Sequence, residues 1–183
     1  MSYAHEFDDT GVHRRLNDLY SALDAKCWTA ALALAFTLPD ACIRLENPDH
    51  RQGGHYKAWV ERYLLPLIRR PTMEGDPMSA SDIYALRCSY LHSSNLESGD
   101  EKTGHKRLDR FMFVAGGNLV DGNLIDNALQ LDAEKFCEDI ARAVLAWYEA
   151  NMSADVVERS KLIARVHDSA ADLTWRDWNP RGG

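Results

Sequence analysis

Residues 79–92 read SASDIYALRCSYLH and form the most clearly marked helix of the chain. Ser79, followed three positions later by Asp82, is the pattern of a helix N-cap with an acidic partner. Apolar side chains then recur with helical spacing on one face: Ile83, Leu86 and Tyr90. The stretch therefore predicts a capped amphipathic helix that packs its apolar face into a core.

Two apolar stripes with helical spacing come before this helix. The first covers residues 12–38 and predicts either one long helix or two helices broken near Asp24. Pro39 is expected to kink or end that run. The second stripe covers residues 56–67, and Pro71 closes its segment. The two stripes are expected to be separate helical runs, with a polar loop from Glu46 to Gly54 between them and a second loop from Thr72 to Met78 before Ser79.

The residues that follow His92 are mostly polar, in contrast to the helical runs before them. Residues 111–115 are apolar and aromatic and are followed by two glycines, and residues 124–131 are a matching run. We expect these two runs to pair as a small β-hairpin. Asp132 then caps a further helix, and Ser153 caps a last helix that extends to about residue 166.

Length and composition indicate one globular domain. The chain has 183 residues, 45% of them hydrophobic, and a formal net charge of −7. This charge excludes a uniformly basic nucleic-acid coat, although a local basic patch remains compatible with it. We predict a mainly α, single-domain helical bundle over residues 1–183, with a β insert at about 108–131 and a carboxy-terminal helix and tail at about 153–183.

The cysteines and the apolar runs bear on metal binding and location. The four cysteines are widely spaced, which favours reduced, mostly buried thiols over a zinc or disulfide site: Cys27, Cys42, Cys88 and Cys137. Residues 1–10 are polar and acidic, unlike an export signal. The longest apolar stretch, residues 28–36, is too short to span a bilayer. We expect a soluble cytoplasmic protein with no metal site and no cofactor.

Arg87 and His92 are the candidate catalytic pair. Histidine titrates near neutral pH and can accept a proton from an attacking hydroxyl. Arginine presents a fixed fork of N–H donors that can relieve charge on a phosphorane. Positions five apart diverge by about 140° on an ideal α-helix, so one copy converges poorly unless the helix ends at His92. Two copies across a two-fold axis would converge better.

The segment from Arg87 to His92 resembles the R-x4-6-H signature of HEPN domains, which are all-α bundles that include many metal-independent ribonucleases. The predicted order of elements is similar to the family's, and the resemblance extends loosely over residues 12–150. Arg44 and His50 have a signature spacing as well, but Asn47 and Pro48 break the helix between them.

Two positions depart from the family pattern. Cys88 stands where the family commonly has asparagine, and Ser94 stands where its toxin branch often has tyrosine. Regulation through modification of that tyrosine is therefore not expected in this chain.

The resemblance implies a metal-independent endoribonuclease that cleaves RNA by attack of the 2′-hydroxyl. It further implies a homodimer with the motif at or near the interface, a toxin or antiphage defence setting, and an antitoxin or other regulatory protein as partner. Candidate substrate-binding residues follow the motif, and those in the basic loop could hold a phosphate backbone: Ser94, Lys102, Lys106 and Arg107.

Other interpretations stay open at the level of sequence. The same pocket could serve a non-catalytic nucleotide- or RNA-binding module, or a regulatory bundle that binds a partner protein. Arg87 could be an ordinary ion-pairing residue, and His92 could interact with the helix dipole of a purely structural protein. The basic loop could be a solvated loop. Whether Arg87 and His92 line one solvent-open cleft separates these interpretations.

Overall fold

The computed structural model describes residues 11–48, 53–68, 78–93, 110–116, 121–125, 128–151, 153–161 and 163. These residues form a mainly α protein with two π-helical turns and a small sheet, as predicted. In chain order, the elements are α1 (Gly11–Asp24), α2 (Trp28–Glu46), α3 (Gly53–Trp59), η1 (Val60–Leu64), α4 (Ala80–Cys88), η2 (Ser89–Ser93), β1 (Arg110–Val114), β2 (Leu124–Ile125), β3 (Ala128–Asp132), α5 (Ala133–Ala150) and α6 (Ala154–Ser160).

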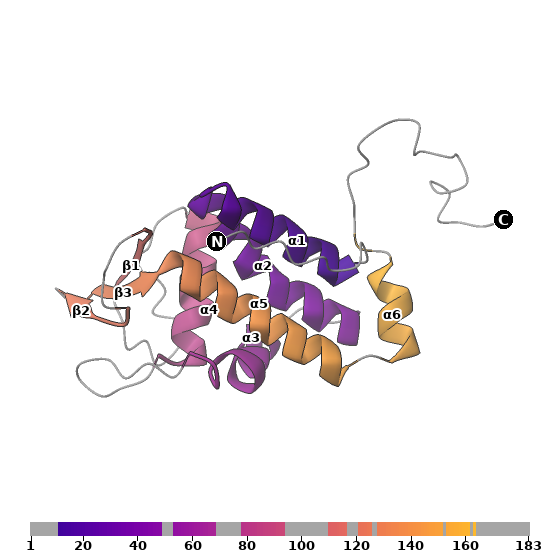
Figure 1. Ribbon diagram of the computed structural model, residues 1–183. Helices are drawn as coiled ribbons and strands as arrows, with labels where there is room; N and C mark the ends of the chain where they lie inside the picture. Colours follow the sequence, from indigo (N-terminus) through magenta and orange to yellow (C-terminus); the bar gives the residue numbers. More distant parts are fainter. Residues whose placement is uncertain are drawn as a thin grey trace.

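Helices α1, α2 and α5 pack against one another and form the body of the bundle. Figure 1 shows α4 crossing this body at the end nearest the sheet, with α6 at the opposite end. Of the two alternatives for residues 12–38, the broken one is correct: α1 ends at Asp24, and Lys26 adopts a positive φ of 56° before α2 begins. Pro39 lies inside α2 and does not end it.

The core is aromatic and aliphatic and is shared by all the long helices. The Phe36 ring lies 5.4 Å from that of Phe136 and 5.3 Å from that of Tyr90, which joins α2 to α5 and to η2. Trp147 is fully buried on α5, and its indole N–H donates to Glu46 at 2.7 Å. This core positions the carboxy-terminal part of α4 against α2, where the candidate site lies.

The helix caps predicted from the sequence are present. Ser79 and Asp82 form a capping box at α4, in which the Ser79 Oγ accepts from the Asp82 N–H and the Ser79 N–H donates to the Asp82 carboxylate. Asp132 caps α5 by accepting from the Lys135 N–H. Ser153 caps α6, but α6 ends at Ser160, earlier than predicted.

The predicted hairpin between residues 111–115 and 124–131 is wrong in its pairing. The sheet has the order β1-β3-β2, in which β1 runs parallel to β3 and β2 runs antiparallel to β3. Residues 124–131 are therefore divided between two strands that pair with each other. A parallel pair cannot be closed by a tight turn, so β1 reaches β3 only after the chain has passed through β2.

All four thiols are free: Cys42 and Cys137 are buried, Cys88 is half-buried and Cys27 is exposed. The apolar segment that begins at Trp28 extends over the whole of α2, so the prediction that it is too short to span a bilayer is wrong by length and composition. Half of its most apolar stretch is buried inside the bundle.

Candidate active site

Arg87 and His92 lie side by side on one protomer. The Arg87 Nη1 atom is 3.2 Å from the His92 Nε2 atom. The expected divergence of about 140° does not occur, because α4 passes into the π-helical turn η2 at Ser89. A π-helical turn holds more residues than an α-helical one, so positions five apart return to nearly the same face. The two side chains thus converge without a second copy of the chain.

Tyr90 holds this π-helical turn against α2. Its hydroxyl donates to the Thr29 carbonyl oxygen at 3.1 Å, and its ring packs on Phe36. Leu86, one turn earlier, is fully buried. The contacts of Leu86 and Tyr90 with the core fix the orientation of α4 and η2. With this orientation, the wider π-helical turn places His92 on the same side of the helix as Arg87.

Asp40 of α2 completes the ion pair of the site. Its Oδ2 atom accepts from the Arg87 Nη2 at 2.6 Å, with 19% of the Arg87 side chain and 38% of the Asp40 side chain exposed. Burial by itself lowers the pKa of the Arg87 guanidinium, but Asp40 and the neighbouring Cys88 outweigh that effect, and the pKa is raised. Arg87 is therefore a permanent cation held at a fixed position.

Aromatic side chains surround the guanidinium. The Arg87 Cζ atom lies 5.8 Å from the centre of the Tyr56 ring on α3, and the Tyr56 and Tyr84 ring centres are 5.6 Å apart. The Lys57 ammonium lies 5.5 Å from the centre of the Tyr84 ring. Gly53 fits closely against this ring, because a Cβ at that position would come within 2.5 Å of the Tyr84 Oη. Helix α3 thus supplies one wall of the site.

Cys88 is a further member of this wall. Its Sγ atom is 3.9 Å from the Arg87 Nη1, and the thiol is half-buried and free. The thiol also interacts electrostatically with the Tyr84 hydroxyl, one helical turn earlier on α4.

His92 and Arg87 together supply groups suited to proton transfer and to charge stabilisation. A guanidinium only donates hydrogen bonds, so a hydrogen bond across the contact of 3.2 Å requires the His92 Nε2 to accept. An exposed imidazole beside a guanidinium has the parts needed to remove a proton from a hydroxyl and to stabilise a phosphoryl oxygen.

Other helices bring side chains to this pair that the motif itself does not indicate. Asp40 and Tyr56 were not singled out, although Asp40 had a signal: a carboxylate in an otherwise apolar helical run needs a partner. Tyr56 was interpreted only as part of an apolar stripe. The predicted substrate-binding residues lie outside the described residues: Ser94, Lys102, Lys106 and Arg107.

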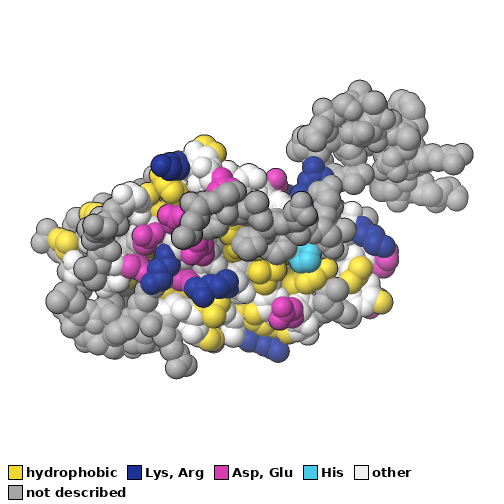
Figure 2. Space-filling model, in the orientation of Figure 1, with side chains coloured by type: hydrophobic (Ala, Val, Ile, Leu, Met, Phe, Trp, Pro, Cys, Tyr) yellow, Lys and Arg dark blue, Asp and Glu magenta, His cyan; other side chains and the backbone are white. Residues whose placement is uncertain are grey.

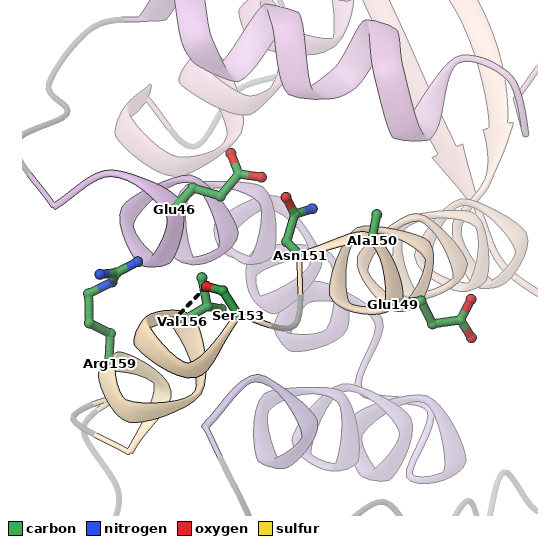
Figure 3. A pocket seen from close by; sticks show the side chains of 7 residues that line it. All are labelled: Glu46, Glu149, Ala150, Asn151, Ser153, Val156 and Arg159. Atoms are coloured by element: carbon green, nitrogen blue, oxygen red, sulfur yellow. Dashed lines mark hydrogen bonds between the residues drawn. The ribbon is translucent and has the colours of Figure 1, made fainter.

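A separate pocket of about 580 Å³ lies where the ends of α2 and α5 meet α6 (Figure 3). Its polar groups already stabilise the fold: Glu46 accepts from Trp147, Arg159 donates to the Leu45 carbonyl at 2.6 Å, and Ser153 caps α6. No residue that lines it comes from α4 or η2. This pocket joins α6 to the bundle and takes no part in the Arg87 site.

On the face of the molecule drawn in Figure 2, Lys and Arg side chains are interspersed with Asp and Glu side chains. No group of three or more His, Cys, Asp or Glu side chains comes together as a metal site within the part of the chain that the structure describes.

Comparison of the chain with protein-family models, curated proteins and solved structures gives no match. The chemistry of the site therefore has to follow from its own geometry and from the resemblance to the HEPN signature.

Proposed function

We propose that this protein is a metal-independent endoribonuclease whose reacting groups are His92 and Arg87. The observation that carries the proposal is the contact of 3.2 Å between the two side chains, with His92 exposed and Arg87 anchored by Asp40. If Arg87 served only to stabilise the fold, its ion pair with Asp40 would be sufficient for that role. An exposed imidazole in contact with the same guanidinium is the additional feature that supports chemistry.

The reaction has two parts. The 2′-hydroxyl of RNA displaces Arg87 from the His92 Nε2, and the imidazole takes the proton of that hydroxyl as its oxygen attacks the adjacent phosphorus. Arg87 gives up its contacts with His92 and Asp40 and turns its N–H groups to the phosphoryl oxygens, where negative charge builds up. The bond from phosphorus to the 5′-oxygen breaks as that oxygen takes a proton from water, and the protonated His92 returns its proton to the solvent. The products are a 2′,3′-cyclic phosphate and a 5′-hydroxyl. No step draws on a metal ion.

The wider setting of the proposal comes from the HEPN resemblance. It comprises a cytoplasmic homodimer, a toxin or antiphage defence role, and an antitoxin or similar protein as regulator. In this proposal Ser94 and the basic loop with Lys102, Lys106 and Arg107 contact the RNA backbone.

A second candidate is a nucleotide- or RNA-binding module without catalysis. One observation favours it: the Arg87 Nη2 already donates to Asp40 and the Arg87 Nη1 contacts His92, so both terminal nitrogens of the guanidinium have partners at rest. In such a module the same side chains would hold a phosphate and no bond would break.

One experiment separates the two candidates. RNA and DNA oligonucleotides of the same sequence are incubated with the protein in EDTA, and both binding and cleavage are measured. The proposed enzyme cuts the RNA and leaves 2′,3′-cyclic phosphate ends, while the DNA stays intact because it lacks the attacking hydroxyl. Binding of RNA without cleavage supports the second candidate, and equal cutting of DNA refutes the mechanism.

A further inference from the structure

Two buried hydrogen-bond donors beside the site have no partner among the described residues: the Tyr56 hydroxyl and the Arg87 Nε. Tyr56 is only 2% exposed, so bulk water does not satisfy its hydroxyl. The guanidinium to which Nε belongs lies over the Tyr56 ring, with Cζ 5.8 Å from the ring centre. An unpartnered tyrosine hydroxyl thus sits in the wall of the candidate active site.

The buried hydroxyl of Tyr56 lowers the stability of the folded protein, and the packing of the ring does not require a hydroxyl at this position. Leaving a buried polar group without a hydrogen bond is unfavourable, and phenylalanine would fill the same space without that cost. Burial raises the pKa of the Tyr56 hydroxyl, Asp40 raises it further, and Arg87 acts in the opposite direction. The hydroxyl therefore lies within the electrostatic field of both members of the ion pair.

Arg87 faces competing demands in the proposed reaction. At rest its Nη2 is bound to Asp40 and its Nη1 to His92, yet it must turn donors toward the phosphate during cleavage. Breaking the bond to Asp40 would leave a partly buried carboxylate without its partner, which is unfavourable. A second donor close to Asp40 would lower that cost.

We propose that Tyr56 is a positioning residue whose hydroxyl donates to Asp40 when Arg87 turns to the RNA phosphate. This inference rests on the proposed ribonuclease function. In the free protein the hydroxyl has no partner among the described residues, and the bound state uses it. Tyr56 does not touch the substrate; it acts through Asp40 and thereby sets how readily Arg87 becomes available.

The test is Tyr56→Phe, with Tyr63→Phe as a matched control from the same helical segment. Tyr63 accepts a hydrogen bond from the Asn151 Nδ2 at 3.0 Å and lies on η1, away from Arg87. We expect Tyr56→Phe to keep or raise the Tm while lowering kcat on RNA about 10-fold, with little change in binding of a 2′-deoxy oligonucleotide. Tyr63→Phe should lower the Tm by about 2–4 °C and leave kcat unchanged.

The outcomes are distinguishable. If Tyr56→Phe keeps full kcat while His92→Ala is inactive, the ribonuclease stands and the role of Tyr56 is refuted. A lower Tm for Tyr56→Phe would also refute it, since the hydroxyl would then already be bonded in the free protein. If the wild-type protein cleaves no RNA, or if His92→Ala cleaves as fast as wild type, the proposed function fails and the inference fails with it.

Discussion

Asp40 carries a charge in the middle of α2, whose buried residues are all apolar. Such a residue is unfavourable for helix packing unless a partner compensates it, and the Arg87 guanidinium does so at 2.6 Å. The bond uses one end of the guanidinium and leaves the other facing His92. Asp40 therefore determines the direction in which Arg87 points, although it is 47 residues away in the chain.

Asp40→Asn tests this directional role. The amide keeps the size of the side chain but removes the charge, so Arg87 should be held less firmly and in more than one orientation. We expect kcat/KM on RNA to fall about 10-fold or more, as is usual when one partner of a charged hydrogen bond is lost. The measurement is steady-state cleavage in EDTA. Asp18→Asn, at an exposed site on α1, is the control, and equal rates for the two variants would contradict the role of Asp40.

At the scale of elements, helix α3 can approach Tyr84 of α4 closely because residue 53 is a glycine. A Cβ on Gly53 would come within 2.6 Å of the Tyr84 Cζ, whereas a Cβ on Gly54 would meet no atom within 4 Å. Both glycines lie in the first turn of α3. The chain thus offers two neighbouring substitutions with opposite consequences for the wall of the site.

Gly53→Ala should destabilise the protein by about 1–3 kcal/mol, because Tyr84 or α3 has to move. Gly54→Ala should be neutral or stabilising by up to about 1 kcal/mol, since alanine favours helix and space is open. Urea denaturation of both variants checks this pair. If Gly53→Ala proves as stable as Gly54→Ala, the contact between α3 and Tyr84 is not as tight as the structure has it.

The elements differ in how far the sequence could predict them. The Ser79 capping box is local, because all its atoms belong to four consecutive residues, and it is present as predicted. The π-helical turn after Cys88 is not local: it depends on Tyr90 reaching Thr29 on α2, which no spacing reveals. The prediction of strand direction in the sheet is wrong for a similar reason. An alternating pattern of apolar residues carries no information about which neighbouring strand runs parallel.

The same distinction applies to the candidate site. The motif residues Arg87 and His92 could be found from the chain because their types and spacing carry the signal. Asp40 and Tyr56 come from other helices, and only the packing of α2 against η2 and of α3 against α4 brings them to Arg87.

At the scale of the whole molecule, buried acids predict loss of stability at alkaline pH. Burial raises the pKa of the Cys137 thiol from 9.0 to about 12, and burial raises that of Cys42 as well. An unfolded thiol releases its proton near pH 9, whereas the folded Cys137 thiol keeps its proton until about pH 12. Deprotonation therefore favours the unfolded state, so stability is complete below pH 9 and falls between pH 9 and 12.

Cys137→Ala should reduce this pH dependence. Each such thiol contributes up to about 1.4 kcal/mol per pH unit within its window, and the variant removes one of them. The measurement is the free energy of unfolding in urea at neutral pH and at several values above pH 9, with Cys27→Ala as the exposed-thiol control. If the free energy of unfolding of Cys137→Ala falls with pH as steeply as that of the wild type, Cys137 is not a source of the alkaline destabilisation.

The assembly of the active site from one chain is also a property of the whole molecule. Because η2 brings Arg87 and His92 together in one protomer, a homodimer is not needed to complete the pair. Arg87→Ala mixed with His92→Ala should therefore regain no cleavage, even if light scattering gives a mass of about twice 20.7 kDa. Recovery of activity on mixing would show that each site takes its residues from two chains.

The most direct test of the central claim is the rate at which His92→Ala cleaves RNA in EDTA, relative to wild type. If His92 removes the proton of the 2′-hydroxyl, the rate should fall by roughly 10²- to 10⁴-fold, the usual contribution of general acid–base catalysis. RNA binding should change little, because a neutral imidazole adds little charge attraction. His55→Ala, at an exposed position on α3, serves as the control and should cleave at the wild-type rate. Full activity of His92→Ala would contradict the claim that this pair performs the chemistry.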